Sequence, residues 1–157
     1  MLHPKTDIGG HIVAKIANNG AGAAGIPSLV TAAGTGDATK VTGQTINNIN
    51  GGQSGVLLTS FVAALTDTKS LSFTVEIQES ADGSTWDTAE VLQAATVAVL
   101  ADSTTNFHGV QRLEVDLKKR KQYVRFNVTP DLSHSGTDTC TWSSVLVVGG
   151  DDVLDAA

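Results

Sequence analysis

The feature that most constrains this chain is a strict alternation of apolar and polar residues from Leu71 to Gln78. A repeat of two places Leu71, Phe73, Val75 and Ile77 on one face of a β-strand and polar residues on the other. Because a strand with one apolar face must bury that face against another layer, the pattern predicts a layered β protein rather than a helical one.

The same repeat recurs in residues 112–117 and 124–129. Residues 56–64 and 139–148 are longer, and in places they are apolar at both odd and even positions. That pattern is typical of strands that are covered on both faces or that carry a bulge. For residues 91–100 the pattern allows two alternatives, a short helix or a short strand at residues 96–100.

Turn residues separate these segments. The Asp82-Gly83 pair favours the positive φ angles of hairpin turns, and residues 50–52, 67–69 and 133–136 have similar turn chemistry. Strands that recur at intervals of roughly 8–15 residues between such turns predict an all-β fold, an antiparallel β-sandwich or jelly roll.

Glycine and aromatic residues are unevenly distributed. Eleven of the 16 glycines lie within the first 55 residues, whereas all seven aromatic residues follow residue 60. Aromatic side chains supply much of the buried area of a core. We therefore expect residues 1–55 to form an extended, Gly/Ala-rich N-terminal arm with long loops and a weak strand at 11–16. Residues 56–150 would form the sandwich core, and residues 151–157 an acidic tail.

The charge and cysteine content argue against several classes of protein. The net charge is −6 and only 17% of residues are charged, which disfavours binding to nucleic acid through a basic face. No apolar run approaches the ~20 residues of a membrane span, and the N-terminus lacks the layout of a signal peptide. A single cysteine, Cys140, excludes an internal disulfide.

Residues able to carry catalysis are sparse and scattered. His3 and His11 fall in the expected arm, His108 and His134 fall in turn-like contexts, and no Gly-x-Ser-x-Gly elbow surrounds any serine. Cys140 lies within a strand pattern, where it is expected to be a small buried hydrophobe. We therefore expect no enzyme activity.

Cofactor and metal signals are equally weak. Residues 20–25 match G-x-G-x-x-G, but no convincing strand precedes them and no helix follows, so no nucleotide site is expected. Asp82 and Asp87 flank a turn, and further aspartates cluster in residues 151–155, without the ligand spacing of an EF-hand. Calcium at the Asp82 turn remains an alternative to plain solvation.

Two features have both a structural and a functional interpretation. The basic run Lys118–Lys121 lies between two strand patterns. A solvated turn is the favoured interpretation, and contact with an acidic protein surface or nucleic acid is the alternative. Trp86 follows a tight turn, and it is expected to pack on its own sheet rather than to stack on a sugar ring.

Two segments follow one another in the chain. Residues 76–86 end in the pattern Ser-x-Asp-Gly-x-x-Trp, and residues 121–129 contain a later strand with the sequence Tyr-Val-Arg. This order resembles small β-sandwich proteins of tailed bacteriophages, in particular jelly-roll head decoration (cement) proteins that bind the outside of the capsid. The resemblance covers about residues 70–148. The same hairpin also occurs in discoidin-like, sugar-binding sandwiches.

The resemblance implies a structural virion protein, located on the capsid surface, that needs no cofactor. Its partners would be the major capsid protein and further copies of itself, as a dimer or trimer. A phage tail-tube or head–tail connector component and a carbohydrate-binding module are the alternatives. The hypothesis assigns partner binding to residues of the arm and of the basic run, namely His11, Ile12, Val13, Ile16, Ile26, Leu29, Lys118, Lys119, Arg120 and Lys121.

Deletion of residues 2–25 tests the predicted role of the arm. If the arm forms part of the capsid-facing or protomer-facing surface, the truncated protein should keep its β circular dichroism but no longer sediment with capsids. Unchanged co-sedimentation of the truncated protein would contradict this role.

Overall fold

The computed structural model describes residues 28–31, 34–48, 54–99, 107–134 and 136–149, and within these ranges it contains strands and no helix. The nine strands are β1 (Ser28–Thr31), β2 (Val41–Thr42), β3 (Ile46–Asn47), β4 (Ser54–Ala64), β5 (Ser70–Ser80), β6 (Glu90–Val99), β7 (Phe107–Asp116), β8 (Tyr123–Leu132) and β9 (Thr139–Gly149).

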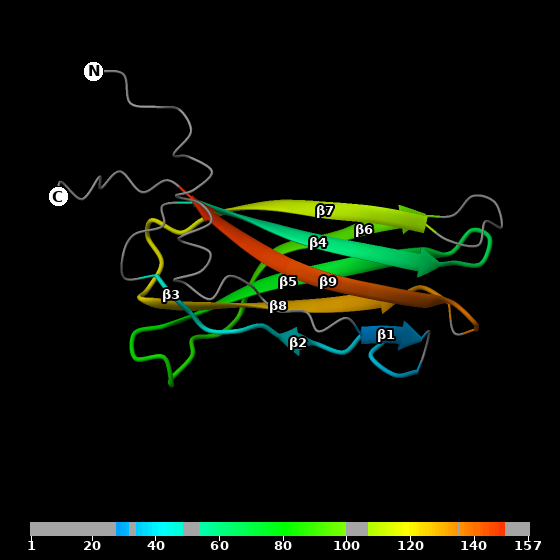
Figure 1. Ribbon diagram of the computed structural model, residues 1–157. Helices are drawn as coiled ribbons and strands as arrows, with labels where there is room; N and C mark the ends of the chain where they lie inside the picture. Colours follow the sequence, from blue (N-terminus) through cyan, green and yellow to red (C-terminus); the bar gives the residue numbers. More distant parts are fainter. Residues whose placement is uncertain (1–27, 32–33, 49–53, 100–106, 135, 150–157) are drawn as a thin grey trace, which may run out of the picture.

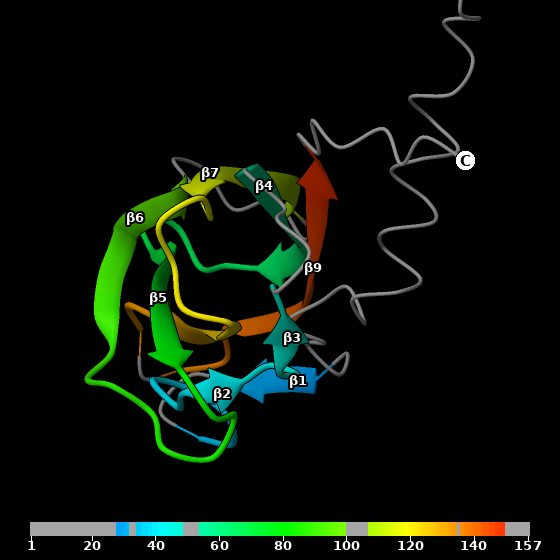
Figure 2. The same cartoon turned by 90° about the vertical axis from the view of Figure 1, so that its left-hand side faces the viewer.

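Two antiparallel sheets lie face to face (Figures 1 and 2). Sheet A has the strand order β1-β9-β4-β7, and sheet B has the order β2-β8-β5-β6, with β3 also paired to β8. Val41 and Ile46 are five positions apart along the chain, whereas their partners Val128 and Val124 are four positions apart, so a one-residue bulge divides β2 from β3. Counted as one interrupted strand, they complete the eight strands of a jelly roll.

The alternation in residues 71–78 is confirmed as the centre of β5. Leu71, Phe73, Val75 and Ile77 are all buried, because this face of sheet B packs against sheet A. Residues 112–117 and 124–129 likewise lie in or next to β7 and β8. The helix considered for residues 91–100 is wrong: β6 occupies this stretch as a ten-residue strand with two register shifts against β5.

Part of the range assigned to the arm belongs to the sandwich. Strand β1 pairs with β9, while β2 and β3 pair with β8. Val30 and Ile46 bury their side chains in the core. The sandwich therefore includes residues before position 56, and β4 itself begins at Ser54.

Aromatic rings from both sheets meet at the centre of the core. The ring centroids of Phe61 and Phe73 are 5.7 Å apart, as are those of Phe73 and Trp142, and Phe107 stacks on Phe61 at 6.1 Å. A Cβ atom on Gly109 would lie 2.4 Å from the Phe61 ring. Glycine at this position of β7 therefore makes room for the ring that joins the two sheets.

The substitution Phe73→Ala tests this core. Removing a fully buried phenylalanine leaves a cavity, and the free energy of unfolding should fall by about 3–5 kcal/mol in urea titrations. Thr74→Ala, the adjacent residue that faces outward, is the matched control and should change stability by less than ~0.5 kcal/mol. A loss below ~1 kcal/mol for Phe73→Ala would show that the alternating face does not carry the core.

Candidate interaction surface

The outer face of sheet A mixes apolar and polar side chains, and the apolar ones are concentrated on its two central strands. Its central strands β4 and β9 pair over eleven positions without a register shift, and β4 pairs with β7 over ten, so outward-facing side chains of the three strands align in rows. No described element lies over these rows. The apolar side chains that they present are Val56, Leu58, Val62 and Ala64 of β4, Val145 and Val147 of β9, and Val110 of β7.

This face accounts for the two-sided apolar pattern of residues 56–64 and 139–148. One set of alternate residues enters the core, and the other set faces outward without cover in the described part of the chain. The exposed fractions of the outward valines are 39% for Val62, 63% for Val110 and 39% for Val145. Uncovered apolar patches on soluble proteins mark sites of interaction. The two-sided apolar pattern of these strands is therefore the sequence signal of a contact surface as well as of a buried or bulged strand.

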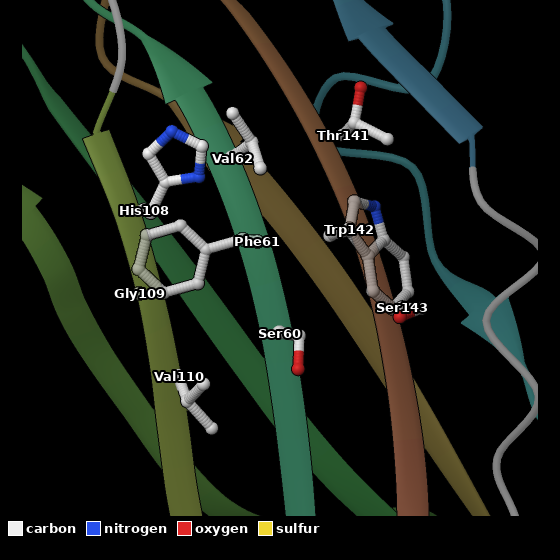
Figure 3. A pocket seen from close by; sticks show the side chains of 9 residues that line it. All are labelled: Ser60, Phe61, Val62, His108, Gly109, Val110, Thr141, Trp142 and Ser143. Atoms are coloured by element: carbon white, nitrogen blue, oxygen red, sulfur yellow. The ribbon is translucent and has the colours of Figure 1, made fainter.

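A shallow hollow lies within this face (Figure 3). The row Ser143–Ser60–Val110 crosses it. The next row, which includes the larger side chains of Val62 and His108, borders it on one side. Small hydroxyl side chains at the centre lower the surface there. The hollow therefore offers hydrogen-bonding groups surrounded by apolar ones, the usual make-up of a protein contact.

The outer face of sheet B is polar on its central strands β5 and β8, whereas its edge strand β6 exposes Val91 and Val99 by 56% and 60%. The Lys40 ammonium lies 2.5 Å from the Glu76 carboxylate, and Arg125 and Asn127 both donate hydrogen bonds to the Gln78 side-chain oxygen, at 3.0 and 3.2 Å. These side chains pair with one another within the sheet, and the Oδ1 atom of Asn127 is left buried without a hydrogen-bond partner. The central strands of the two sheets therefore differ in their readiness to bind an apolar partner.

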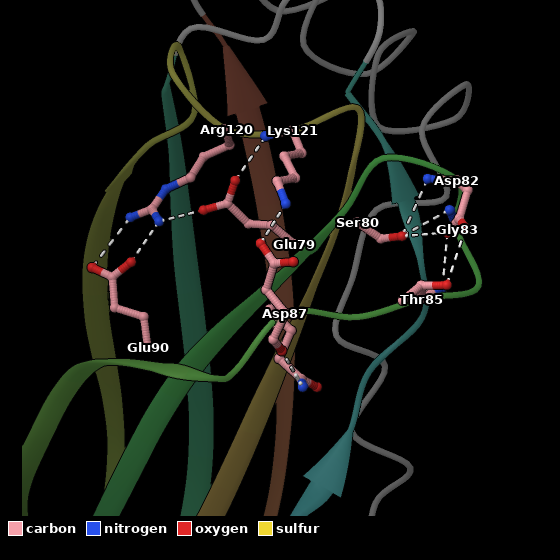
Figure 4. A network of polar contacts seen from close by, with 10 residues as sticks. Glu79, Ser80, Asp82, Gly83, Thr85, Asp87, Glu90, Arg120 and Lys121 are labelled. Carbon is pink, nitrogen blue, oxygen red and sulfur yellow. Dashed lines mark hydrogen bonds and ion pairs between the residues drawn. The ribbon is translucent and has the colours of Figure 1, made fainter.

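Half of the predicted basic run is held in ion pairs within the chain (Figure 4). Arg120 Nη1 donates to Glu79 at 2.7 Å and to Glu90 at 2.6 Å, and Lys121 Nζ donates to Asp87 at 2.6 Å. Hydrogen bonding to Arg120 lowers the pKa of Glu90, and the bonds to Glu90 and Glu79 raise the pKa of the guanidinium. The network ties the β7–β8 connection to the β5–β6 connection.

Lys118 and Lys119 are the exposed half of the run. The backbone N–H of Lys118 donates to the Asp116 carboxylate at 2.9 Å, and no ion pair of either ammonium occurs among the described residues. Of the arm residues assigned to partner binding, Leu29 lies in β1 with its backbone opposite Thr141. The others, His11, Ile12, Val13, Ile16 and Ile26, lie outside the described residues.

Asp82 organises the loop that carries the decoration-protein resemblance (Figure 4). Its carboxylate accepts hydrogen bonds from the backbone N–H groups of Ser84 and Thr85, at 2.8 and 2.7 Å, and from the Ser80 hydroxyl at 2.9 Å. Together these bonds hold the pKa of Asp82 well below its usual range. Within the described ranges no group of three or more His, Cys, Asp or Glu side chains could hold a metal ion.

The two tryptophans differ in what they could bind. The Arg125 guanidinium lies 4.0 Å above the centre of the Trp86 ring, so one face of this ring is covered by the chain's own sheet. Trp142 is buried in the aromatic core. Trp86 therefore packs on its own sheet, as expected, and Trp142 has no free face for a sugar.

The described histidines and the cysteine do not converge. His108 lies within β7, not in a turn as predicted, and borders the hollow, whereas His134 lies in the β8–β9 connection. Cys140 is buried in β9, and burial raises the pKa of its thiol to about 12, which makes the thiol unreactive in the folded protein. Among the described residues, no helix has the length and hydropathy needed to cross a membrane.

The Asp82 loop predicts a specific loss of stability in acid. An Asp carboxyl titrates near pH 3.9 in the unfolded chain, and its pKa is lower in the folded protein. The carboxylate therefore stabilises the fold above about pH 4, and this contribution is lost as the pH falls toward the folded pKa. Asp82→Asn should lower stability at pH 7 and flatten its decline between about pH 5 and pH 2.

Urea titrations across this range measure the effect. Asp67→Asn, a substitution in the exposed β4–β5 connection, is the matched control and should leave the profile unchanged. A profile of Asp82→Asn that is parallel to that of the unsubstituted protein would contradict the role of this carboxylate.

Comparisons with known proteins find similarity only among solved structures. No family model and no curated protein sequence matches the chain. The structure of infectious bursal disease virus strain Gx is 13% identical with a TM-score of 0.45, covering 85% of this chain and 32% of that chain. The VP2 subviral particle of the same virus is 14% identical with a TM-score of 0.41, covering 77% and 29%.

A carbohydrate-binding module is also similar. CBM6cm-2 from Cellvibrio mixtus lichenase 5A, in complex with cellotriose, is 15% identical with a TM-score of 0.38, covering 81% of this chain and 90% of that chain. The chain spans about a third of the length of the viral chains that it matches. Viral shell proteins and carbohydrate-binding modules are thus both among its structural neighbours.

Proposed function

We propose that this chain is a structural virion protein that binds the outside of a tailed-phage capsid as a head decoration protein. The observation that supports it best is the contrast between the two outer faces of the sandwich. The central strands β4 and β9 of sheet A present uncovered valine and leucine side chains, whereas the central strands β5 and β8 of sheet B present polar side chains that pair with one another. A protein with one apolar face of this kind is suited to binding a surface that is already assembled.

The physical demands on a decoration protein agree with this arrangement. Such a protein reinforces contacts between subunits and carries out no chemistry, so it needs a rigid body and a broad contact. Interlocked aromatic rings hold the two sheets together, which keeps the outer face of sheet A in one shape. Each Å² of apolar surface that docking removes from water contributes roughly 25 cal/mol, so a broad valine-rich face supplies useful affinity.

The polar groups of the face favour a protein partner. Arg112 and Glu114 at one end of β7 pair with each other at 2.8 Å, so they leave little net charge on the face. Hydroxyl groups of Ser60, Thr141 and Ser143 can exchange hydrogen bonds with water for bonds with a partner. A phosphate backbone would require a concentration of cations that this face does not present in the described residues.

The same composition supports a binding role over a catalytic one. The hollow is lined by apolar and hydroxyl side chains together with the imidazole of His108. A hydroxyl nucleophile needs a base within hydrogen-bond reach, and no hydrogen bond joins His108 to a hydroxyl of the hollow in the described structure. We therefore assign the hollow to docking, and we propose that the protein is not an enzyme.

Val62→Asp places a charge beside the hollow of this face and tests the proposal. Co-sedimentation with undecorated heads of the phage that encodes the chain should weaken at least tenfold, because the charge would have to be desolvated on docking. Val145→Lys, on the neighbouring strand, should weaken binding similarly. Thr74→Asp on the outer face of sheet B is the matched control and should bind as the unsubstituted protein does.

Stability in urea establishes that each variant is folded, so that lost binding can be attributed to the face. Binding of Val62→Asp and Val145→Lys that equals that of the control would overturn the proposed contact. Location of the protein in a tail ring by electron microscopy would favour a tail or connector component instead. Binding to a glycan array that is lost in Trp86→Ala would favour a carbohydrate-binding module.

A further inference from the structure

One of the four sheet edges differs from the others. Strand β1 is only four residues long, the β2–β3 edge is broken by a bulge, and β6 has two register shifts against β5. Strand β7 runs for ten residues in unbroken register with β4 and forms the other border of sheet A (Figure 1). Short and bulged edges resist pairing with other chains, whereas a long regular edge is a template for it.

The free side of β7 has no strand partner in the described structure. Strand β6 lies near it at the corner of the sandwich but belongs to sheet B, and the contact between the two includes a side-chain bond from Gln111 to Gln93 at 2.9 Å. Val110, in the middle of β7, is 63% exposed and has the largest exposed fraction among the large apolar residues of the described structure. The edge therefore combines unpaired backbone with uncovered apolar surface.

Residue Gln111 indicates what pairs with this edge. It is 91% buried, its Nε2 donates to Gln93, and its Oε1 atom is buried without a hydrogen-bond partner. A buried unpaired acceptor costs free energy. If a second copy of β7 lies antiparallel with its Gln111 opposite, the two side chains share one face about 5 Å apart. Each amide retains a second N–H, and if the two side chains turn toward the axis this N–H can donate to the unpaired Oε1 of the other.

The same register matches the remaining side chains of the strand. Antiparallel pairing about Gln111 places His108 opposite Glu114 of the second copy and Val110 opposite Arg112. Imidazole and carboxylate form a hydrogen-bonded pair across strands, and the aliphatic part of an arginine side chain can cover a valine. Both pairs occur twice because of the two-fold symmetry. The same edge of each copy is therefore complementary to itself.

We propose that the protein forms a two-fold symmetric dimer in which β7 pairs antiparallel with β7 of a second copy, with the axis at Gln111. The pairing joins the two A sheets into one continuous sheet, so their apolar outer faces lie side by side. This dimer does not depend on the proposed attachment to a capsid, and it is tested on the isolated protein.

Disulfide formation between His108→Cys and Glu114→Cys tests the register. A mixture of the two single variants should give a disulfide-linked dimer under mild oxidation, and neither variant alone should, because like positions then lie roughly 20 Å apart across the axis. The double variant should also cross-link between chains, since six residues along one strand are too far apart to bridge. The buried Cys140 thiol does not compete.

The double variant Thr141→Cys/Val147→Cys is the matched control, with the same spacing on the outward face of β9, and should stay monomeric on non-reducing gels. Sedimentation velocity then tests the interface without cysteine. Val110→Lys would face Arg112 of the second copy and should raise the dimer dissociation constant at least tenfold. Val145→Lys, away from the edge, should leave that constant unchanged.

The dimer is overturned if the unsubstituted protein is monomeric at about 100 μM, which is well above the dissociation constants usual for specific dimers. It is also overturned if the double variant fails to cross-link. Cross-linking of either single cysteine variant with itself would overturn the register. These outcomes are separate from the capsid experiment, because Val145→Lys is expected to lose capsid binding while it keeps the dimer.

Discussion

The structure depends on two central strands that are apolar on both of their faces. Strands β4 and β9 must bury one face to form the core, and Phe61 and Trp142 do so against Phe73 of the opposite sheet. Their second face is not needed by the sandwich, yet it keeps Val62, Val145 and their neighbours. A chain that gained nothing from this face could carry threonine or serine there, as the outer face of β5 does. The surplus hydrophobicity is therefore best explained by a partner.

Charge is arranged to leave that face as the main unsatisfied surface of the described structure. Glu79, Glu90 and Asp87 receive the guanidinium of Arg120 and the ammonium of Lys121, and the Asp82 carboxylate is surrounded by donors of its own loop. Half of the basic run, Arg120 and Lys121, is thus used to join two connections. The cations of Arg120 and Lys121 are neutralised by carboxylates of the chain itself. They therefore contribute little attraction for polyanions.

Sequence reasoning recovered the fold but not the features that depend on register. A repeat of two identified β5, β7 and β8, because each has one buried face. It missed the full length of β6, whose two bulges interrupt the alternation, and it could not place β1 to β3, which are too short to show any repeat. The pairing of Arg120 with Glu79 joins positions 41 residues apart. It follows from strand order, which composition and spacing do not contain.

The hollow and the β7 edge were hidden from sequence for the same reason. Ser60, Ser143 and Val110 form one row only because three strands lie in a particular register. That register also explains how the two proposed contacts can coexist. Docking on the outer face of sheet A acts perpendicular to the sheet, whereas pairing at β7 acts within its plane. Edge pairing would leave the apolar rows facing outward and would double the number of rows that one particle presents. Two linked copies would then bind a repeating surface with a gain in avidity that neither contact provides alone.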